Sequence, residues 1–114
     1  MKKMNRLLKN NDFKRVMNYN HREKTPEMLV FIKPNNLSYM RVGLSVSKKI
    51  GKAHLRVKIR RQLRACFSLI KMYNICCDVV VVIRIGYLSK SFEENKEILK
   101  KNLDILIKGE KIDD

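Results

Sequence analysis

The sequence predicts a single α+β domain in which a small mixed β-sheet carries three helices, in the order α-β-β-(β)-α-β-α. Three observations support this fold class. The chain has 114 residues, enough for one modest core but not for two. Residues 40–46 alternate between apolar and other side chains, whereas residues 79–83 form an unbroken β-branched run; both patterns are typical of strands. Residues 54–72 and 91–109 repeat apolar side chains at helical spacing.

The N-terminal part is predicted to hold an exposed basic tail, residues 1–9, and then a short helix. Asn10 or Asn11 is expected to cap the free amides at the start of this helix, because short polar side chains accept hydrogen bonds there. One face of the helix carries three apolar side chains, Phe13, Val16 and Met17. A core-facing stripe is one interpretation of this face and applies best to Val16.

Two strands are predicted next. Residues 19–27 are polar and contain Pro26, so they read as a connection with room for one very short strand. Residues 28–33 form a clear strand, the Pro34-Asn35-Asn36 segment a turn, and residues 37–47 a strand that returns antiparallel.

The second of these strands has two different faces. One is apolar, whereas the other carries small or polar groups, including Gly43 and Ser45, with Tyr39 and Arg41 towards one end. This second face is either an ordinary solvent-facing side of an antiparallel sheet or a shallow trough with room for a strand of nucleic acid.

The last third is predicted to be scaffold. Residues 78–83 should lie inside the sheet, parallel to the strand at residues 37–47. Ser91 and Glu94 have the spacing of a capping box, which opens the last helix. Gly109 is expected to end this helix, and residues 110–114 to fray. The core stripe of the helix comprises Phe92, Leu99, Leu103 and Leu106.

The helix at residues 54–72 is both amphipathic and basic. Its apolar arc comprises Leu55, Ile59, Leu63, Cys66 and Ile70. Arg56, Arg60 and Arg64 form a row beside this arc, at spacing i, i+4, i+8, with Lys58 and Arg61 further round. Because like charges at this spacing repel and no glutamate is interleaved, the natural partner of the row is a polyanion.

The charge of the chain supports the same conclusion. There are 26 Lys and Arg against 11 Asp and Glu, giving a net charge of +15. Residues 28–77 contain no acidic side chain at all. Such a basic protein points to nucleic acid or to an anionic membrane surface. We expect no membrane association and a cytoplasmic location, because no apolar run approaches a spanning length and no signal peptide is recognisable.

No catalytic or metal-binding constellation is predicted. The three cysteines are an odd number with two adjacent, which does not make a disulfide framework. His21 and His54 are far apart in the sequence, and the Walker A spacing is absent. We therefore expect no catalytic residue, no bound metal and no small-molecule cofactor.

The region between the second strand and the basic helix resembles a known family, the protein subunit of bacterial ribonuclease P. That family has a strand ending in serine and two lysines, a glycine-containing loop, and an arginine-asparagine-arginine signature followed by further basic residues. The matching residues here are Ser47, Lys48, Lys49, Gly51, Lys52, Arg56, Val57, Lys58, Arg60, Arg61, Leu63 and Arg64. Val57 and Lys58 depart from the signature.

The resemblance implies a fold with a left-handed β-α-β crossover and two sets of RNA-binding residues. The set expected to bind the RNA subunit is Lys52, Arg56, Lys58, Arg60, Arg61 and Arg64. The set expected to line a cleft for the single-stranded 5′ leader of precursor tRNA is Phe13, Met17, Phe31, Ser45, Ser47, Lys48 and Lys49.

The resemblance also implies a function. The chain would be the non-catalytic protein subunit of a ribonucleoprotein endoribonuclease, with the catalytic RNA and precursor tRNA as partners and with magnesium held through the RNA. The alternative from composition is a structural ribosomal or RNA-chaperone protein. A reader of the DNA major groove is less favoured, because Gln62 is the only side chain on the basic helix suited to discriminating base edges.

Overall fold

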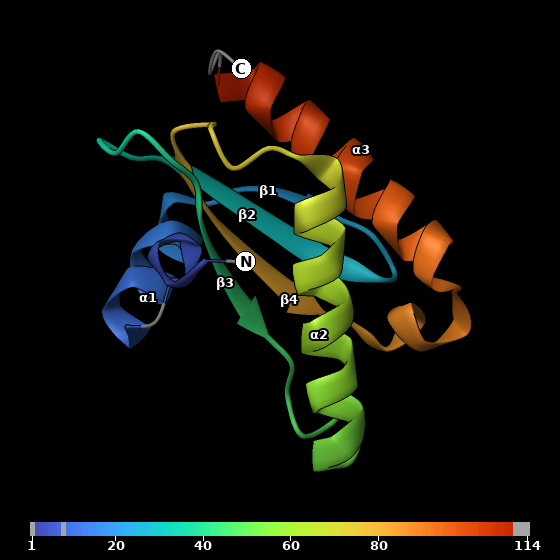
Figure 1. Cartoon of the computed structure of the whole chain (residues 1–114). Coiled ribbons are helices and arrows are strands. Elements are labelled where there is room, and N and C mark those ends of the chain that lie inside the picture. Colours follow the sequence, from blue (N-terminus) through green and yellow to red (C-terminus); the bar gives the residue numbers. More distant parts are fainter. Residues whose placement is uncertain (1, 8, 111–114) are drawn as a thin grey trace.

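The computed structural model describes residues 2–7 and 9–110 and shows four strands and three α-helices in one α+β domain (Figure 1). This confirms the predicted fold class. The strands are β1 (His21–Lys24), β2 (Met28–Pro34), β3 (Arg41–Ser45) and β4 (Cys77–Ile83). The helices are α1 (Asn10–Tyr19), α2 (Ala53–Ile70) and α3 (Phe92–Glu110), with short 3-10 turns η1 (Lys3–Asn5) and η2 (Ile85–Ser89).

The sheet has the strand order β1-β2-β4-β3. β4 is antiparallel to β2 and parallel to β3, as predicted for an interior strand. It occupies this position because its valines are apolar on both faces, and Val79, Val80 and Val81 are each fully buried. The expected direct pairing of residues 28–33 with residues 37–47 was wrong, since β4 lies between β2 and β3. The left hand of the β3–α2–β4 crossover stays a prediction from the family resemblance.

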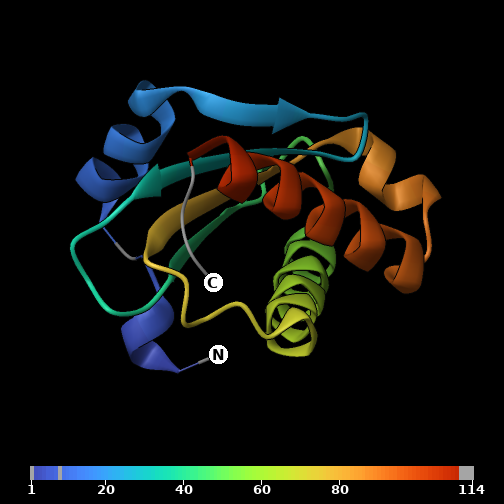
Figure 2. The ribbon, with the colours of Figure 1, turned by 90° about the horizontal axis from the view of Figure 1, so that it is seen from above.

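The two faces of the sheet are covered differently. α1 lies on one side of the sheet, whereas α2 and α3 lie on the other (Figures 1 and 2). The main core lies between the sheet and α2 and α3, and includes Val79, Leu63 and Leu103. A smaller cluster lies under α1 and is formed by Leu7, Val16, Phe31 and Val80, with Phe13, Leu29 and Val82 at its margin.

The helix α3 begins as predicted but ends later. The backbone amide of Ser91 donates to Glu94 Oε1 at 3.0 Å, and the amide of Glu94 donates to Ser91 Oγ at 3.1 Å, which completes the capping box. These bonds lower the pKa of the Glu94 carboxyl. Gly109 does not end the helix, which continues to Glu110. The carboxylate of Glu110 accepts a hydrogen bond from Tyr19 Oη at 2.9 Å, so the expected fraying can concern only residues 111–114, which lie outside the described residues.

One prediction for the N-terminal part was wrong. Lys9 precedes α1 without a side-chain cap, so neither Asn10 nor Asn11 caps that helix. The segment before it exposes the side chains of Lys2 and Arg6 but is not detached from the domain. The amide of Leu7 donates to Val42 O at 2.9 Å, and Leu7 is buried. The described residues 2–7 therefore run along the outer edge of β3, the side that β4 leaves unpaired.

Candidate nucleic-acid interface

The basic helix α2 is held against the sheet by its apolar face. Ile59, Leu63 and Cys66 are buried, as the helical spacing predicts, and Phe67, which lies outside the predicted arc, is buried as well. Arg56, Arg60 and Arg64 follow one another along one flank, and none of the three is fully exposed. Arg56 Nε donates to the carbonyl oxygen of Gly51 at 3.2 Å, which ties the start of the helix to the preceding loop.

A cleft of about 580 Å³ opens beside this row of arginines. We call it the Phe13 cleft. Its walls come from four parts of the chain, namely the N-terminal segment, α1, β3 with the residue that follows it, and α2. The lining residues are Arg6, Leu7, Asn10, Phe13, Lys14, Val42, Leu44, Ser45, Val46, Arg60 and Arg64. An aromatic ring and several cations therefore face one space.

The floor of the Phe13 cleft is closed over Gly43. A Cβ atom built on Gly43 would lie 2.6 Å from Cζ of Phe13, so the ring rests directly on the glycine backbone. The trough that the sequence suggested above Gly43 is thus filled by the protein's own aromatic side chain. Of the two small residues of the predicted trough, Gly43 and Ser45, only Ser45 lines the open cleft.

The cations of α2 are not neutralised by ion pairs with other side chains among the described residues. Within residues 2–7 and 9–110, the ion pairs are Arg15–Asp12, His21–Glu110, Arg41–Asp78 and those of Lys96 with Glu93 and Glu97. None of them involves α2. Nε of Arg64 is shielded from solvent and has no hydrogen-bond partner among the described atoms. A guanidinium in this condition can bind a phosphate that enters the cleft.

The remaining residues of the predicted RNA-subunit set lie around α2. Lys52 is exposed at the N-cap position of the helix. Arg61 is exposed, and Lys58 lines a shallow depression together with Gln62 and Tyr87. The set therefore divides, because Arg60 and Arg64 turn into the Phe13 cleft whereas Lys58 and Arg61 do not line it.

The predicted leader set also divides. Phe13 and Ser45 line the Phe13 cleft, and Ser47, Lys48 and Lys49 are exposed in the connection from β3 to α2. Met17 is 37% exposed on α1 and does not line the cleft. Phe31 is only 3% exposed and belongs to the cluster under α1, where the Arg22 guanidinium lies 6.0 Å from its ring.

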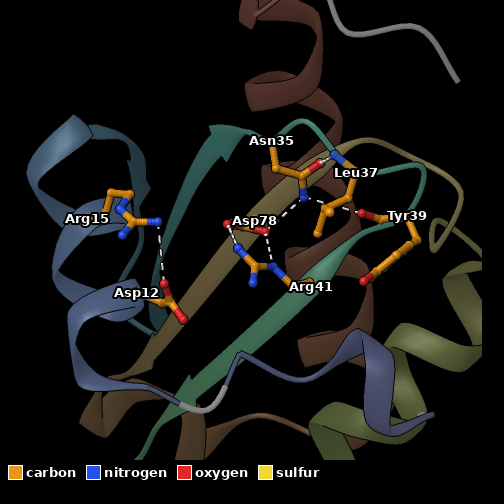
Figure 3. A network of polar contacts seen from close by, with 7 residues as sticks. All are labelled: Asp12, Arg15, Asn35, Leu37, Tyr39, Arg41 and Asp78. Atoms are coloured by element: carbon orange, nitrogen blue, oxygen red, sulfur yellow. Dashed lines mark hydrogen bonds and ion pairs between the residues drawn. The ribbon is translucent and has the colours of Figure 1, made fainter.

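One arginine of the acid-free region is not available to a ligand. Arg41 binds Asp78 through two hydrogen bonds, Nε to Oδ1 at 2.9 Å and Nη2 to Oδ2 at 2.7 Å (Figure 3). Asn35 Nδ2 adds a third donor to Asp78 Oδ1 at 2.8 Å. The bonds to Asp78 raise the pKa of Arg41. This ion pair therefore joins the start of β3 to the start of β4.

Several lining residues were not predicted from the sequence. Arg6 and Lys14 add cations to the Phe13 cleft from the N-terminal segment and α1. Their charge was visible, but their position depends on the contact of the N-terminal segment with β3. Across the described ranges no group of three His, Cys, Asp or Glu side chains is arranged to hold a metal ion. No helix within those ranges is long and apolar enough to cross a membrane.

Comparison with known proteins shows which family this chain belongs to. The model of the family described as Ribonuclease P matches residues 1–107. The chain belongs to the ribonuclease P protein family. The ribonuclease P protein component of Lactococcus lactis subsp. cremoris strain MG1363 is 38% identical over 112 residues, which cover 98% of this chain and 92% of the relative. That of Staphylococcus aureus strain Mu50 is 36% identical over 85 residues, which cover 74% of each chain.

Solved ribonuclease P proteins have the same fold. The Staphylococcus aureus RNase P protein superposes with a TM-score of 0.80 at 31% identity, covering 89% of this chain and 94% of the other. The RNase P protein of Thermotoga maritima, solved in complex with 1-(4-fluorophenyl)-2-thiourea, gives a TM-score of 0.74 at 27% identity, with 88% and 95% covered. The resemblance seen in the sequence is thus confirmed.

Membership of the ribonuclease P family settles the choice between the functional hypotheses. The chain is the protein component of a ribonucleoprotein, which implies a role with the catalytic RNA in removing the 5′ leader of precursor tRNA. The structural ribosomal and RNA-chaperone alternative has no comparable support.

Proposed function

We propose that the Phe13 cleft holds the 5′ leader of precursor tRNA and that the outward cations of α2 bind the ribonuclease P RNA. The observation that carries the proposal is the position of Phe13. Its ring is fixed on Gly43 and faces the same cleft as Arg60 and Arg64. A stacking surface beside cations suits a single strand whose sequence varies, because every base has an aromatic face and every nucleotide a phosphate.

The two arginines in the cleft have a specific role in this proposal. Arg60 and Arg64 are one helical turn apart, so they can contact successive phosphates of a strand lying in the cleft. Planar guanidinium groups bind phosphate oxygens in pairs, which fixes the position of the strand as well as its affinity. Lys14 on α1 would neutralise phosphates from the opposite wall.

The RNA subunit would contact the other basic groups of the region. Lys52, Lys58 and Arg61 are exposed and lie towards the N-terminal half of α2. Arg56 lies between these residues and the cleft. Ser47, Lys48 and Lys49 stand where the leader could pass from the Phe13 cleft towards the RNA subunit. The protein would thus hold the two RNA strands next to each other.

We further propose that the chemistry of cleavage belongs to the RNA. Magnesium held by the RNA subunit would supply a polarised water and charge neutralisation at the scissile phosphate. The residues of this chain would contribute binding and orientation. Positioning alone can lower a reaction barrier substantially, because the entropy of bringing the reactants together is lost on binding.

The dependence of binding on salt tests the cleft. We expect Arg60→Ala with Arg64→Ala to reduce the slope of log affinity against log salt by about 1.4, because each lost phosphate contact with a single strand removes about 0.7. The measurement is the dissociation constant of precursor tRNA for the reconstituted ribonucleoprotein over a series of salt concentrations. It is paired with leader removal at low magnesium.

A matched control removes the same charge elsewhere. Lys100 and Lys101 are exposed on α3, away from the Phe13 cleft. Replacing both with alanine should leave the slope for precursor tRNA unchanged. An equal loss of slope in the two double variants would show that only net charge matters and would remove the Phe13 cleft from the proposal.

A further inference from the structure

A second cavity, of about 510 Å³, lies near the start of β3. We call it the tyrosine pocket. Two tyrosines line it, Tyr39 from the segment before β3 and Tyr73 from the turn after α2. Met4 and Lys2 face it from the N-terminal segment, and Ser68 faces it from the last turns of α2. The proposed binding surface described above uses none of these residues.

The tyrosine pocket is lined by the same two segments as the Phe13 cleft. Asn5 lines the pocket and its neighbour Arg6 lines the cleft. On α2, Arg64 lines the cleft and Ser68, one helical turn further on, lines the pocket. Ser68 Oγ donates to the carbonyl oxygen of Arg64 at 3.1 Å. The two hollows are therefore neighbours along the N-terminal segment and along α2.

The distance between the two hollows suits a short stretch of single-stranded RNA. Tyr39 of the pocket precedes Val42 of the cleft by three residues and Ser45 by six, roughly 10–20 Å at ~3.3 Å per residue. A stacked strand advances about 3.4 Å per nucleotide. A strand that leaves the Phe13 cleft in this direction thus reaches the tyrosine pocket within about three to six nucleotides.

The chemistry of the tyrosine pocket matches an unpaired base better than a phosphate. Its wall combines the two tyrosine rings and the thioether of Met4, which is 51% exposed, with the short polar side chains of Asn5, Ser38, Ser68 and Asn74. The hydroxyl of Tyr73 is shielded from solvent, with the side chain of Ser68 beside it. A base edge that reaches this hydroxyl would add a hydrogen bond to the stacking. Lys2 is placed to neutralise the attached phosphate.

We propose that the tyrosine pocket receives a base of the 5′ leader upstream of the nucleotides in the Phe13 cleft. This inference rests on the proposed function of the cleft. The upstream direction follows from α2. Its N-terminal half carries the cations assigned to the RNA subunit, which cuts the leader, whereas Ser68 and Tyr73 lie at its C-terminal end. Nucleotides far from the cut therefore extend towards the tyrosines.

A series of leaders lengthened one nucleotide at a time tests the inference on the reconstituted ribonucleoprotein. With the wild-type chain, the affinity for precursor tRNA should rise at one length, by roughly 5- to 140-fold for one stacked base. Tyr39→Leu should abolish this rise and leave the affinity for shorter leaders unchanged. Tyr73→Phe keeps the ring and should reduce the rise by about threefold, the loss of one hydrogen bond. Tyr19→Leu is the control, because Tyr19 is exposed on α1 and lines neither hollow.

Two outcomes would overturn the inference. One is that the affinity rises with leader length equally in wild type and in both pocket variants. The other is that Tyr39→Leu weakens precursors of every leader length, or the RNA subunit itself, by the same factor, which would assign the pocket to assembly with the RNA subunit. The proposed function fails separately, because its test is the salt dependence of the Arg60 and Arg64 variants, which can be measured on a precursor whose leader is too short to reach the tyrosine pocket.

Discussion

The close contact between Gly43 and Phe13 predicts that a single methyl group at position 43 will disturb the Phe13 cleft. In Gly43→Ala the new Cβ would lie 2.6, 2.8 and 3.0 Å from Cζ, Cε2 and Cε1 of Phe13. Carbon atoms in favourable contact are about 3.5–4.0 Å apart. The ring must therefore move by roughly 1 Å. Because β3 lies beneath the ring, it can move only into the cleft.

The expected cost follows from two opposing effects. Overpacking of this kind destabilises a protein by about 1–3 kcal/mol. Alanine also restricts the unfolded chain, which stabilises by about 0.4–1 kcal/mol where the backbone conformation is compatible. It is compatible here, because no glycine among the described residues has a positive φ. We expect a net loss of about 0.5–2 kcal/mol in the free energy of unfolding, together with weaker binding of precursor tRNA.

A double-mutant cycle isolates the contact. Urea unfolding of wild type, Gly43→Ala, Phe13→Ala and the double variant gives the coupling energy, which should be about 1–3 kcal/mol. With the ring absent, Gly43→Ala should be neutral or slightly stabilising. Gly51→Ala is a useful comparison, since the nearest atom is the flexible methyl Cδ2 of Leu55 at 2.6 Å, which can move aside. An identical penalty for Gly43→Ala with and without the Phe13 ring would refute this reasoning.

Three further predictions concern other parts of the fold. Arg41→Ala leaves the buried Asp78 carboxylate with only one described hydrogen-bond donor, so urea unfolding should show a loss of about 2–3 kcal/mol; a change near zero would contradict it. Glu94→Gln should be less stable than wild type at neutral pH, and this difference should vanish as the pH falls through the pKa of Glu94, which is lowered, because only the carboxylate form is favoured by the cap. Burial raises the pKa of the Cys77 thiol to about 12, so an alkylating reagent at about pH 8 should label the partly exposed Cys76 first and Cys77 only on unfolding; mass spectrometry of the labelled peptides would decide.

Features set by local pattern were predicted well from the sequence. The β-branched run at residues 79–83 required cover on both faces, and β4 lies inside the sheet. The spacing of Ser91 and Glu94 predicted a capping box because both of its hydrogen bonds join residues three positions apart. The helical row of Arg60 and Arg64 followed from periodicity in the same way.

Features that depend on distant partners were not predicted. The turn after β2 has the composition of a hairpin, but the strand between β2 and β3 comes from residues 77–83, which only the tertiary fold brings there. The pairing of Arg41 with Asp78 follows from the register of β3 on β4, so a count of charges along residues 28–77 treated Arg41 as free. A single apolar residue in a polar segment, such as Leu7, forms no periodic pattern. Its contact with β3 could therefore not be predicted.

The sequence predicted which residues belong to the candidate site better than it predicted how they are arranged. The sequence identified Phe13 and the arginines of α2 but assigned them to separate surfaces. The structure brings Phe13, Arg60 and Arg64 to one cleft because the N-terminal segment, α1 and α2 all meet at β3. Phe31 could not be distinguished from a cleft residue without knowing which neighbours cover it.

The strand order has a consequence for how the protein is made. Among the described strands, β3 pairs only with β4, yet β4 is synthesised more than thirty residues later. A nascent chain that has left the ribosome as far as α2 carries all the basic residues of the cleft but lacks β4, which joins β3 to β2. The proposed RNA-binding surface can therefore assemble only after residue 83 has emerged, which would delay specific capture of RNA by an unfinished polypeptide.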